Sequence, residues 1–430
     1  MVDGRLVKCN YCGTKILLRF QMGYFDIPFD ICCPKCKGRI NGIRKIVDEH
    51  KFEINGAKDQ ECRTEDIDFF ADFSVELPHR KITKYESINS LISSGFSPFM
   101  MAMQIMGHDD YEKYTQQIGR FIGFKSKLFP RISAFYSMYF NGNIEYLQSP
   151  LLKISEAYVI KNPLDASMSL HQLLVIHLNT ILPDVSFKEF TDCSQAILRM
   201  VRSGSFSSVD NLIMLLGGKE YFNRETKKIL NITSDLCDMF EAFIPVVMLC
   251  LSDKRDSIDK NTYGISTVSF SKLKTFYANT YELILELIDI PVALNNLQHR
   301  GNIDEFSDNS EFKDLKSFRN LPKGKKAKAL CDGEVFTKPI HIDRNVRNAI
   351  DHFDYEYDVT SQKITFRDKY NGKENNVEMY LLDLAYLCYD NIIILSYLNE
   401  LLYNLQKIDY TKDGLMPHIG PIKSLNLEET

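Results

Sequence analysis

A chain of 430 residues is longer than the ~250–300 residues that one hydrophobic core organises, so two or three domains are expected. Hydrophobic residues make up 44% of the chain and charged residues 25%, which excludes a collagen-like or wholly disordered protein. The net charge of −5 excludes attraction of the whole protein to nucleic acid, so any such contact needs a local basic patch.

The sequence favours a cytoplasmic protein without a membrane partner. It begins Met-Val-Asp-Gly-Arg, with no apolar segment behind these residues. Its longest apolar runs, residues 242–251 and 391–398, are shorter than the ~18–20 residues of a membrane span. Five of the 11 cysteines lie within residues 9–36, and outside a secreted context such clustering favours a metal site over disulfides.

Residues 1–50 are predicted to form a zinc ribbon from two Cys-x-x-Cys pairs separated by 20 residues. The four cysteines are Cys9, Cys12, Cys33 and Cys36. Each pair lets one tight turn aim two thiolates at the same ion, and two turns complete the tetrahedron that Zn²⁺ prefers, a closed structural site. Gly13 and Gly38 are expected to allow unusual backbone angles in these turns. Cys32 is an alternative ligand to Cys33, and buried or redox-active thiols are the alternative to a metal.

Two regions follow along the chain. Residues 51–85 are predicted to be a short β-rich segment, with a β-like run over residues 68–77 that Pro78 breaks. Residues 86–262 are predicted to be a helical region of unknown role, because apolar residues recur three and four apart in several stretches. These stretches are residues 134–139, 151–160, 169–182 and 193–201. Gly217-Gly218 and the polar residues 252–263 are expected to interrupt the helices.

Residues 263–410 are predicted to be a third domain, with a polar tail over residues 411–430. It should begin with one long helix over residues 272–290, which Pro291 ends or kinks. The elements expected after it are a charged stretch at 300–328, a helix at 343–353, strands near 356–359 and 363–367, a tight turn at Asn371-Gly372, an extended run at 375–379 and a final helix at 380–405. The whole chain is therefore expected to be a mainly α, multi-domain protein with a small β part at its N-terminus.

The helix predicted at residues 343–353 has two different faces when its residues are placed 100° apart. The core side carries Val346, Ala349, Ile350 and Phe353. The other side carries Arg344, Arg347, Asn348, Asp351 and His352. Arg347 and Asp351 are four residues apart and can pair. Histidine is the side chain suited to proton transfer near neutral pH, and a surface helix with a chance histidine is the alternative interpretation.

The motif Arg347-Asn348-x-x-x-His352 resembles the Arg-polar-x-x-x-His signature of the HEPN superfamily (higher eukaryote and prokaryote nucleotide-binding domains). The long helix before it, the β-hairpin after it and the closing apolar helix fit this resemblance, which covers about residues 268–407. Catalytic members are metal-independent endoribonucleases of toxin–antitoxin and antiviral systems, and they usually act as dimers with two motifs facing each other.

The resemblance implies a role for each residue of the motif. His352 would act as general base or acid on the ribose 2′-hydroxyl, and Arg347 would stabilise charge on the phosphate. Asn348 would hold the histidine, and the products would carry 2′,3′-cyclic phosphate and 5′-hydroxyl ends without any catalytic cofactor. Possible RNA-binding residues are Arg344, Lys323, Lys325, Lys326 and Lys328.

The expected partners are RNA, further copies of this chain in a dimer or higher oligomer, and a phage-derived or protein trigger. The alternative function is a non-catalytic HEPN module for interaction or nucleotide binding that carries a structural zinc ribbon. A further alternative is a zinc-ribbon scaffold in which the C-terminal motif is accidental.

Overall fold

The structure, a computed structural model, describes residues 1–46, 51–60, 66–87, 97–265, 270–307, 310–332, 335–370 and 373–420. The chain forms two compact units, and each unit is assembled from three separate stretches of sequence. Unit 1 comprises Met1–Thr115, Met239–Ala278 and Asp343–Tyr389, whereas unit 2 comprises Gln116–Asp238, Asn279–Ile342 and Asp390–Thr430. The sequence analysis expected consecutive segments, and these units cross the expected boundaries near residues 86 and 263.

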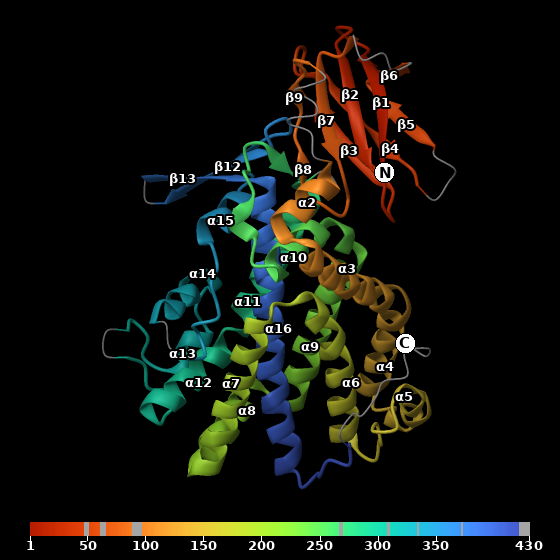
Figure 1. The fold of residues 1–430 in the computed structure, drawn as a ribbon. Helices are drawn as coiled ribbons and strands as arrows, with labels where there is room; N and C mark the ends of the chain where they lie inside the picture. The colour runs from red at the N-terminus through yellow and green to blue at the C-terminus, as the bar shows by residue number, and fades with distance from the viewer. Residues whose placement is uncertain are drawn as a thin grey trace. The chain divides into compact units, whose positions relative to one another are not determined.

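Unit 1 begins with two packed β-sheets, drawn in red and orange in Figure 1. The strands are β1 (Val2–Cys9), β2 (Lys15–Gln21), β3 (Ile27–Cys32), β4 (Arg39–Arg44), β5 (Phe52–Asn55), β6 (Ala57–Gln60), β7 (Phe69–Phe73), β8 (His79–Arg80) and β9 (Thr83–Lys84). One sheet has the order β6-β1-β2-β7-β9 and the other the order β3-β4-β5. All neighbours are antiparallel except β2 and β7, which are parallel.

The sequence analysis expected the β strands after residue 50 to form a segment of their own. Strands β5, β6, β7 and β9 instead join the sheets that the first four strands begin. β5 pairs with β4, β6 pairs with β1, and β7 pairs with β2. The physical reason is that the β1–β2 and β3–β4 hairpins have unpaired N–H and C=O groups along their edges, and the later strands satisfy them. The cysteine segment and the β-rich segment therefore share one core.

That core is built from alternating apolar residues on the inner faces of the two sheets. Phe20, Phe29, Phe52 and Phe73 form a cluster of aromatic rings whose neighbouring centroids are 5.4–5.8 Å apart. Arg19 and Asp72 are cross-strand neighbours on β2 and β7, where they form a buried ion pair with an N–O distance of 2.6 Å. Apolar packing and this paired charge together fix the register of the parallel strands.

The rest of unit 1 consists of helices, the short strand β10 and a further small sheet. Its elements are α2 (Pro98–Met106), the start of α3 (His108–Gly123), α10 (Ile244–Leu251), β10 (Tyr263–Gly264), the start of α11 (Phe270–Leu287), α15 (Arg344–Asp351), β11 (Tyr355–Asp358), β12 (Lys363–Tyr370), β13 (Lys373–Tyr380) and the start of α16 (Leu381–Lys412). The predicted hairpin and third run are a three-stranded antiparallel sheet in the order β11-β12-β13. The predicted turn at Asn371-Gly372 lies outside the described residues.

Two side chains connect this part of unit 1 to its neighbouring segments. The Lys81 ammonium donates to the carbonyl oxygens of Lys260 at 2.7 Å and Ser361 at 2.6 Å. The Gln362 side chain accepts from the N–H of Ile265 at 3.2 Å and donates to its carbonyl oxygen at 3.0 Å. These bonds satisfy backbone groups in segments that are distant in sequence, and β8 pairs with β10 beside them.

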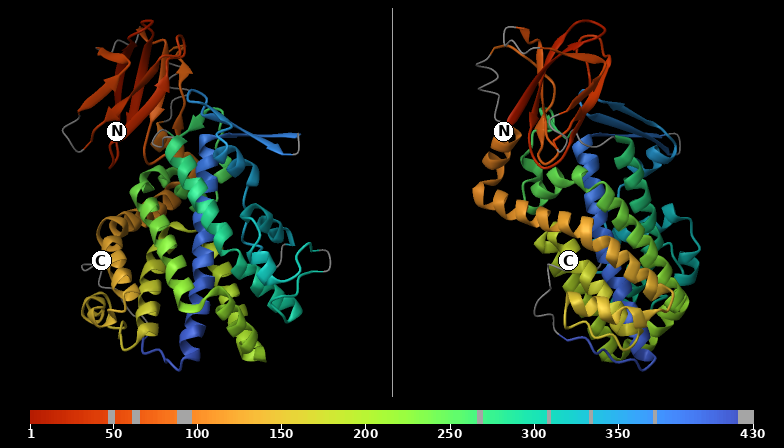
Figure 2. Two further views of the ribbon diagram at one scale, coloured as in Figure 1. Left: turned by 180° about the vertical axis from the view of Figure 1, so that it is seen from behind. Right: turned by 90° about the vertical axis from the view of Figure 1, so that its right-hand side faces the viewer.

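Unit 2 is helical and is organised around the later part of α16. Its other helices are α4 (Phe129–Phe140), α5 (Gln148–Ile154), α6 (Pro163–Leu178), α7 (Asp184–Met200), α8 (Phe206–Leu216), α9 (Gly218–Asp238), α12 (Asp289–Arg300), α13 (Leu315–Arg319) and α14 (Lys323–Lys326). Figure 2 shows α16, in blue, passing among these helices. Gln406 of α16 accepts from Ser167 of α6 at 2.8 Å, and Tyr397 donates to Cys193 of α7 at 3.2 Å.

The mainly α fold class is confirmed, and most predicted helices are present with altered ends. The stretch 151–160 is an exception, because α5 ends at Ile154 and the next helix starts with a capping box at Asn162 followed by Pro163. Gly217 ends α8 in the left-handed conformation, with φ 110°. The long helix predicted at 272–290 is divided at Ile288, so that Pro291 falls in the first turn of α12, where its missing N–H is tolerated.

α16 is longer than predicted and is apolar enough, by length and composition, to cross a membrane. It continues to Lys412, whereas the sequence analysis ended this helix at residue 405 and saw only a short apolar run at residues 391–398. Its most apolar window has a mean hydropathy of 1.4, and 72% of that window is buried inside the structure. Such burial is that of a core helix in a globular protein.

Burial of His79 makes the stability of this protein depend on pH. His79 is 2% exposed, and burial lowers its pKa to about 4. In the unfolded chain an imidazole binds its proton near pH 6.5, so stability is complete above that pH and is lost as the pH falls toward 4. Between pH 7 and pH 5 we expect this group to reduce the free energy of unfolding by about 2 kcal/mol.

Urea denaturation of the wild type and of His79→Gln at both pH values measures this contribution. The variant should show a smaller pH dependence, whereas His108→Gln, at an exposed histidine, should keep that of the wild type. An unchanged pH dependence in His79→Gln would contradict the assignment.

Candidate functional site

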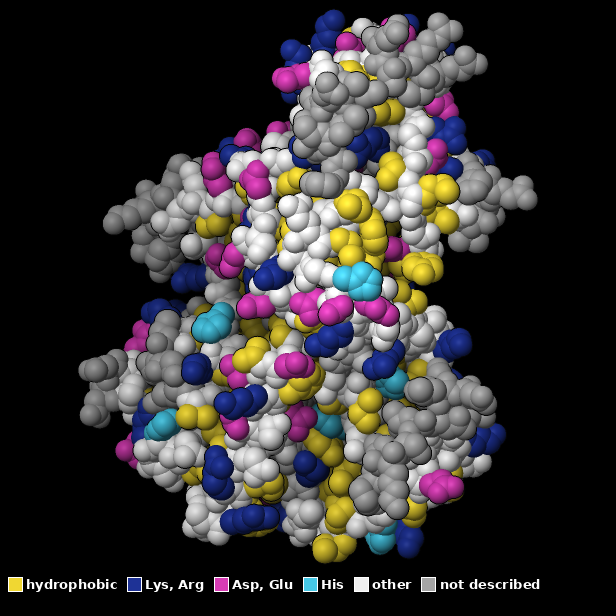
Figure 3. Space-filling view, viewed as in Figure 1, with side chains coloured by type: hydrophobic (Ala, Val, Ile, Leu, Met, Phe, Trp, Pro, Cys, Tyr) yellow, Lys and Arg dark blue, Asp and Glu magenta, His cyan; other side chains and the backbone are white. Residues whose placement is uncertain are grey.

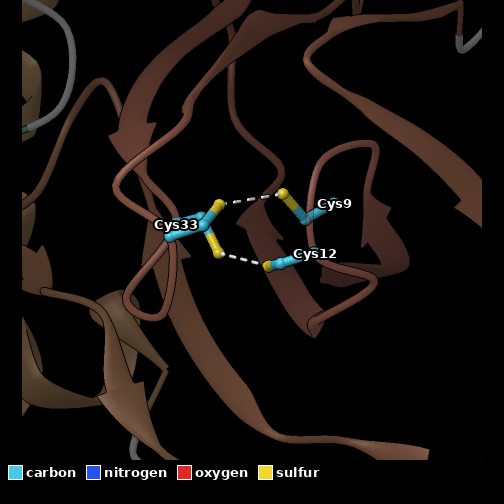
Figure 4. A group of neighbouring side chains, drawn as sticks. Cys9, Cys12 and Cys33 are labelled. Atoms are coloured by element: carbon cyan, nitrogen blue, oxygen red, sulfur yellow. Dashed lines mark hydrogen bonds between the residues drawn. The ribbon is translucent and has the colours of Figure 1, made fainter.

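Four cysteines meet at one end of the β sandwich of unit 1. They are Cys9, Cys12, Cys33 and Cys36. The β1–β2 turn carries the first pair and the β3–β4 turn the second, and Figure 4 shows the side chains of Cys9, Cys12 and Cys33 converging from the two turns. All four sulfur atoms lie within 4.8 Å of one another, with Sγ–Sγ distances of 3.6 Å between Cys9 and Cys36 and 3.5 Å between Cys12 and Cys33.

This arrangement could hold one metal ion. Four sulfur atoms placed ~2.3 Å from a central ion in a tetrahedron are ~3.8 Å apart, which is close to the distances between these thiols. Cys9 and Cys33 are buried, whereas Cys36 is exposed. The donor set is four soft thiols with no carboxylate or imidazole among them, which suits a structural ion that binds no substrate.

The choice between Cys32 and Cys33 is decided by the geometry. Cys33 is fully buried and belongs to the group of four sulfur atoms, whereas Cys32 does not. Adjacent residues of a β strand point to opposite faces, so only one of the two can join the cluster. Burial and the carboxylate of Asp30 raise the pKa of Cys32, which disfavours the thiolate that a metal needs.

Charge explains why this cluster favours a cation. A hydrogen bond to the Thr14 hydroxyl, at a Sγ–Oγ1 distance of 3.1 Å, is the main cause that lowers the pKa of Cys12 to about 6. The Gly38 N–H opposes a rise at Cys36, but desolvation and the neighbouring thiols outweigh it and raise the pKa of Cys36 to about 12. Four thiolates so close together repel one another, and a divalent ion at their centre would remove that repulsion.

The two glycines of these turns act differently. Gly13 has φ 74°, as expected for a turn that needs the left-handed region. In the second turn the residue with positive φ is Lys37, at 61°, so the expected role of Gly38 is wrong. At Gly38 a Cβ atom would lie 2.6 Å from the Tyr11 ring, so a larger residue would have to displace that exposed side chain.

The second candidate site is the helix α15 of unit 1, whose N-terminus is capped and whose apolar face is packed on a sheet. Asp343 caps its N-terminus by accepting from the N–H groups of Asn345 and Val346 at 2.9 and 3.2 Å. The Tyr277 hydroxyl of α11 donates to the Asp343 carbonyl oxygen at 2.9 Å. The apolar stripe of Val346, Ala349 and Ile350 is buried, and α15 packs on β12 and β13.

Phe353 does not belong to this stripe, contrary to the sequence analysis. α15 ends at Asp351, with His352 as its C-terminal cap, and Phe353 then takes a positive φ of 57°. The periodicity of 100° per residue therefore stops before Phe353, whose side chain is 77% exposed.

The polar residues of the motif lie together on the outer side of α15. The Arg347 guanidinium pairs with the Asp351 carboxylate at 2.8 Å and donates to the Asn348 side-chain oxygen at 3.4 Å. The backbone N–H of His352 donates to the Asn348 carbonyl oxygen at 3.0 Å, and the His352 side chain is exposed. A cation, an amide and an imidazole thus lie within the last turns of one helix, with the imidazole exposed and the other two groups partly exposed.

The lysine run of unit 2 lies in the short helix α14 and in the 3-10 helix Ala327–Asp332 that follows it. The Lys323 ammonium is bound by Glu282 at 3.0 Å and Glu286 at 2.8 Å. Lys326 is buried and pairs with Asp289 at 2.8 Å. Lys328 pairs with Glu311 at 2.8 Å, and Lys325 is exposed.

Three of the four lysines thus already face a carboxylate, which reduces their attraction for a phosphate backbone. Both signs of charge are also interspersed over the molecular face in Figure 3. Arg344 of α15 is exposed, like Lys325.

Sequence reasoning missed a cavity of about 420 Å³ inside unit 1. Its lining comes from β3, β7, β8, β11, the start of α11 and the β11–β12 connection, which lie far apart in sequence. The one local signal was Pro78, which the sequence analysis treated only as a break. The three residues after it, His79, Arg80 and Lys81, all line the cavity.

Comparisons with models of protein families, with curated proteins and with solved structures found no match to this chain.

The cysteine cluster generates a prediction about metal content. We expect the purified wild type to hold one metal ion per chain and Cys33→Ser, which removes one of the four converging thiols, to lose it. Cys32→Ser makes the same chemical change one residue away and should keep a full equivalent. Inductively coupled plasma mass spectrometry after gel filtration measures both. If Cys33→Ser retained the metal ion and Cys32→Ser lost it, the ligand assignment would be reversed.

The lysine run generates a prediction about stability. Asp289 pairs with both Lys326 and Arg319 in a buried setting. Asp289→Ala leaves the buried ammonium of Lys326 and the half-buried guanidinium of Arg319 without their carboxylate, and we expect the free energy of unfolding to fall by about 3 kcal/mol. Lys325→Ala, at the exposed neighbour, should change it by less than about 0.5 kcal/mol. Urea denaturation compares the two, and equally small effects would contradict a structural role for the run.

Proposed function

We propose that this chain is a metal-independent endoribonuclease of the HEPN type, with Arg347, Asn348 and His352 of α15 at its reaction centre. The observation that carries the proposal is the grouping of these polar side chains on one side of a short helix whose apolar stripe is buried, with His352 exposed and Arg347 and Asn348 partly exposed. The helix is capped and held on its sheet, so its polar side is presented to solvent by a supported element. RNA is the proposed substrate.

The chemistry that these residues can perform needs no metal at the reacting phosphate. A neutral His352 would take the proton of a ribose 2′-hydroxyl, whose oxygen then attacks the adjacent phosphorus atom. The bond from phosphorus to the 5′-oxygen breaks, and that oxygen takes a proton as it leaves. Arg347 would stabilise the negative charge on the phosphoryl oxygens during the displacement. The products are a 2′,3′-cyclic phosphate and a 5′-hydroxyl.

One histidine per motif supports the proposal of a homodimer or higher oligomer. The reaction needs both a base and an acid, and a second copy of α15 would supply the second imidazole. Asn348 would position the histidine at such an interface. Arg344, Lys325 and Lys328 are the exposed members of the predicted RNA-binding set, and Lys328 is paired with Glu311.

We propose Zn²⁺ as the ion of the cysteine cluster, in a structural role. Zn²⁺ prefers four thiolates in a tetrahedron, and such a closed site supports folding without taking part in the reaction. The proposed setting is the cytoplasm of a cell that uses RNA cleavage as a toxin or an antiviral defence. There a phage-derived or protein trigger would relieve inhibition of the nuclease.

A second candidate function is a non-catalytic module for interaction or nucleotide binding. The observation that favours it is the ion pair between Arg347 and Asp351, because a guanidinium that is already bound is less available to a phosphate. The exposed imidazole of His352 favours the enzyme, and activity distinguishes the two.

Incubation of the full chain with mixed RNAs in EDTA tests the proposal. We expect wild-type cleavage with cyclic phosphate ends, detected by their removal with a cyclic phosphatase. His352→Ala should reduce the rate about 10²–10⁴-fold because the proton-transfer group is lost. Arg347→Ala should reduce it about 10²–10³-fold because charge on the phosphate is no longer stabilised.

His341→Ala is the matched control, since it removes another exposed histidine from the segment that precedes α15. It should cleave at the wild-type rate. In cells, expression of the wild type should be toxic and His352→Ala should remove the toxicity without loss of soluble protein. Cleavage by His352→Ala at the wild-type rate would overturn the assignment, and absence of cleavage and toxicity in the wild type would favour the non-catalytic module.

A further inference from the structure

The cavity of unit 1 has the size and lining of a small-molecule site. Its volume of about 420 Å³ lies within the ~300–1,000 Å³ of typical ligand pockets. Its lining includes none of the four clustered cysteines and no residue of α15. Binding of a ligand in this cavity is therefore independent of the proposed RNA cleavage.

Aromatic side chains form much of the lining. Phe29 and Phe73, of β3 and β7, are each 2% exposed and also belong to the sandwich core. Phe270, at the start of α11, stacks on Tyr357 of β11 with ring centroids 4.8 Å apart. Flat aromatic faces from several elements favour a ligand with a planar ring system, which gains contact area by stacking.

Besides Oδ1 of Asp72, which lies in the ion pair with Arg19, three polar atoms in the same lining are buried without a hydrogen-bond partner among the described residues. They are Nε2 of His79, Nε of Arg80 and Oγ1 of Thr360. An unpaired buried polar group costs about 1–3 kcal/mol, and folded proteins usually satisfy such groups. A ligand with complementary donors and acceptors would satisfy all three.

The roles of these atoms can be assigned from their surroundings. The Nδ1 atom of His79 is 3.4 Å from the carbonyl oxygen of Arg80, to which it can only donate. Burial lowers the pKa of the ring and so favours its neutral form, in which one ring nitrogen donates and the other accepts. The Arg80 Nε–H is a donor, and the Thr360 hydroxyl can act in either sense. The lining is therefore complementary to a ligand with a planar ring whose edge carries both hydrogen-bond donors and acceptors.

Charge in the lining disfavours a cationic ligand. The carboxylates of Asp30 and Asp72 are already engaged, by Arg39 at 2.6 Å and Arg19 at 2.6 Å. Lys81 and Arg80 add two cations to the same lining, although the Lys81 ammonium is bound by backbone carbonyls. A neutral or anionic ligand therefore fits the balance of charge better than a cation.

We propose that this cavity binds a purine nucleoside or its monophosphate. The purine ring would stack on the aromatic lining, and its edge would pair with His79, Arg80 and Thr360. A bicyclic ring uses the available volume better than a single pyrimidine ring. Arg39, which lines the cavity, pairs with Asp30, so a phosphate would have to displace that carboxylate to reach the guanidinium.

Isothermal titration of the full chain with adenosine, AMP, GMP and UMP tests the proposal. We expect saturable binding of a purine compound, at least tenfold tighter than binding of UMP. If AMP binds more tightly than adenosine the phosphate contributes, and if the two bind equally the nucleoside is recognised. No binding of any purine compound, or equal binding of UMP, would overturn the proposal.

Two variants connect binding to the cavity. Ser271 lines the cavity and is exposed at the start of α11, so Ser271→Trp fills the space from its surface and should weaken binding at least tenfold. Thr360→Val removes one hydroxyl and should weaken it about tenfold. The control is Thr365→Val, the same change on β12 away from the lining, which should bind like the wild type. Circular dichroism confirms that each variant is folded.

A wild-type affinity in Ser271→Trp would also overturn the proposal, because the ligand would then occupy another part of the chain. Binding is measured without RNA, so the result is independent of the proposed nuclease. A chain that binds AMP but cleaves no RNA would keep this site and remove only the nuclease.

Discussion

Convergence of four cysteine thiols at one point is the constraint on which the β part of the protein depends. The β1–β2 hairpin belongs to the five-stranded sheet and the β3–β4 hairpin to the three-stranded sheet, so their turns belong to different layers. A metal ion held by both turns would join the layers at one end, while the cluster of phenylalanine rings joins them along their length. Because metal binding to such a site is coupled to folding, the positions of β3, β7 and β8 would follow from it. These strands in turn form part of the cavity lining.

Features written in a few neighbouring residues could be predicted from the sequence. The two Cys-x-x-Cys pairs identify the cluster because each pair needs only one turn to position two sulfur atoms. The helices around α6, α7 and α11 were predicted because apolar residues at helical spacing mark a buried face. Asp343 and the buried stripe of α15 follow from the same local rules of capping and periodicity.

Features that depend on distant partners could not be predicted in this way. Residues 66–73 alone do not predict that β7 lies parallel to β2, because the pairing depends on the free edge of β2. From the sequence alone Lys326 is expected to be a solvated charge, because its ion pair with Asp289 forms only in the folded chain. The cavity is the extreme case, because its lining needs the sandwich, the start of α11 and the β11–β12 connection at once.

Assembly of unit 1 from three stretches has a consequence for the order of events during synthesis. The Lys81 ammonium binds the Ser361 carbonyl oxygen across 280 residues of chain. At ~5–20 residues per second a ribosome needs about 15–60 s to make that length. The β sandwich can form while the remainder is still being made, but its contacts with the last stretch must wait and must also overcome a large loop-closure entropy. Messages truncated before residue 343 would therefore yield metal-binding fragments that lack both α15 and a complete cavity, and such fragments would be natural targets for cellular quality control.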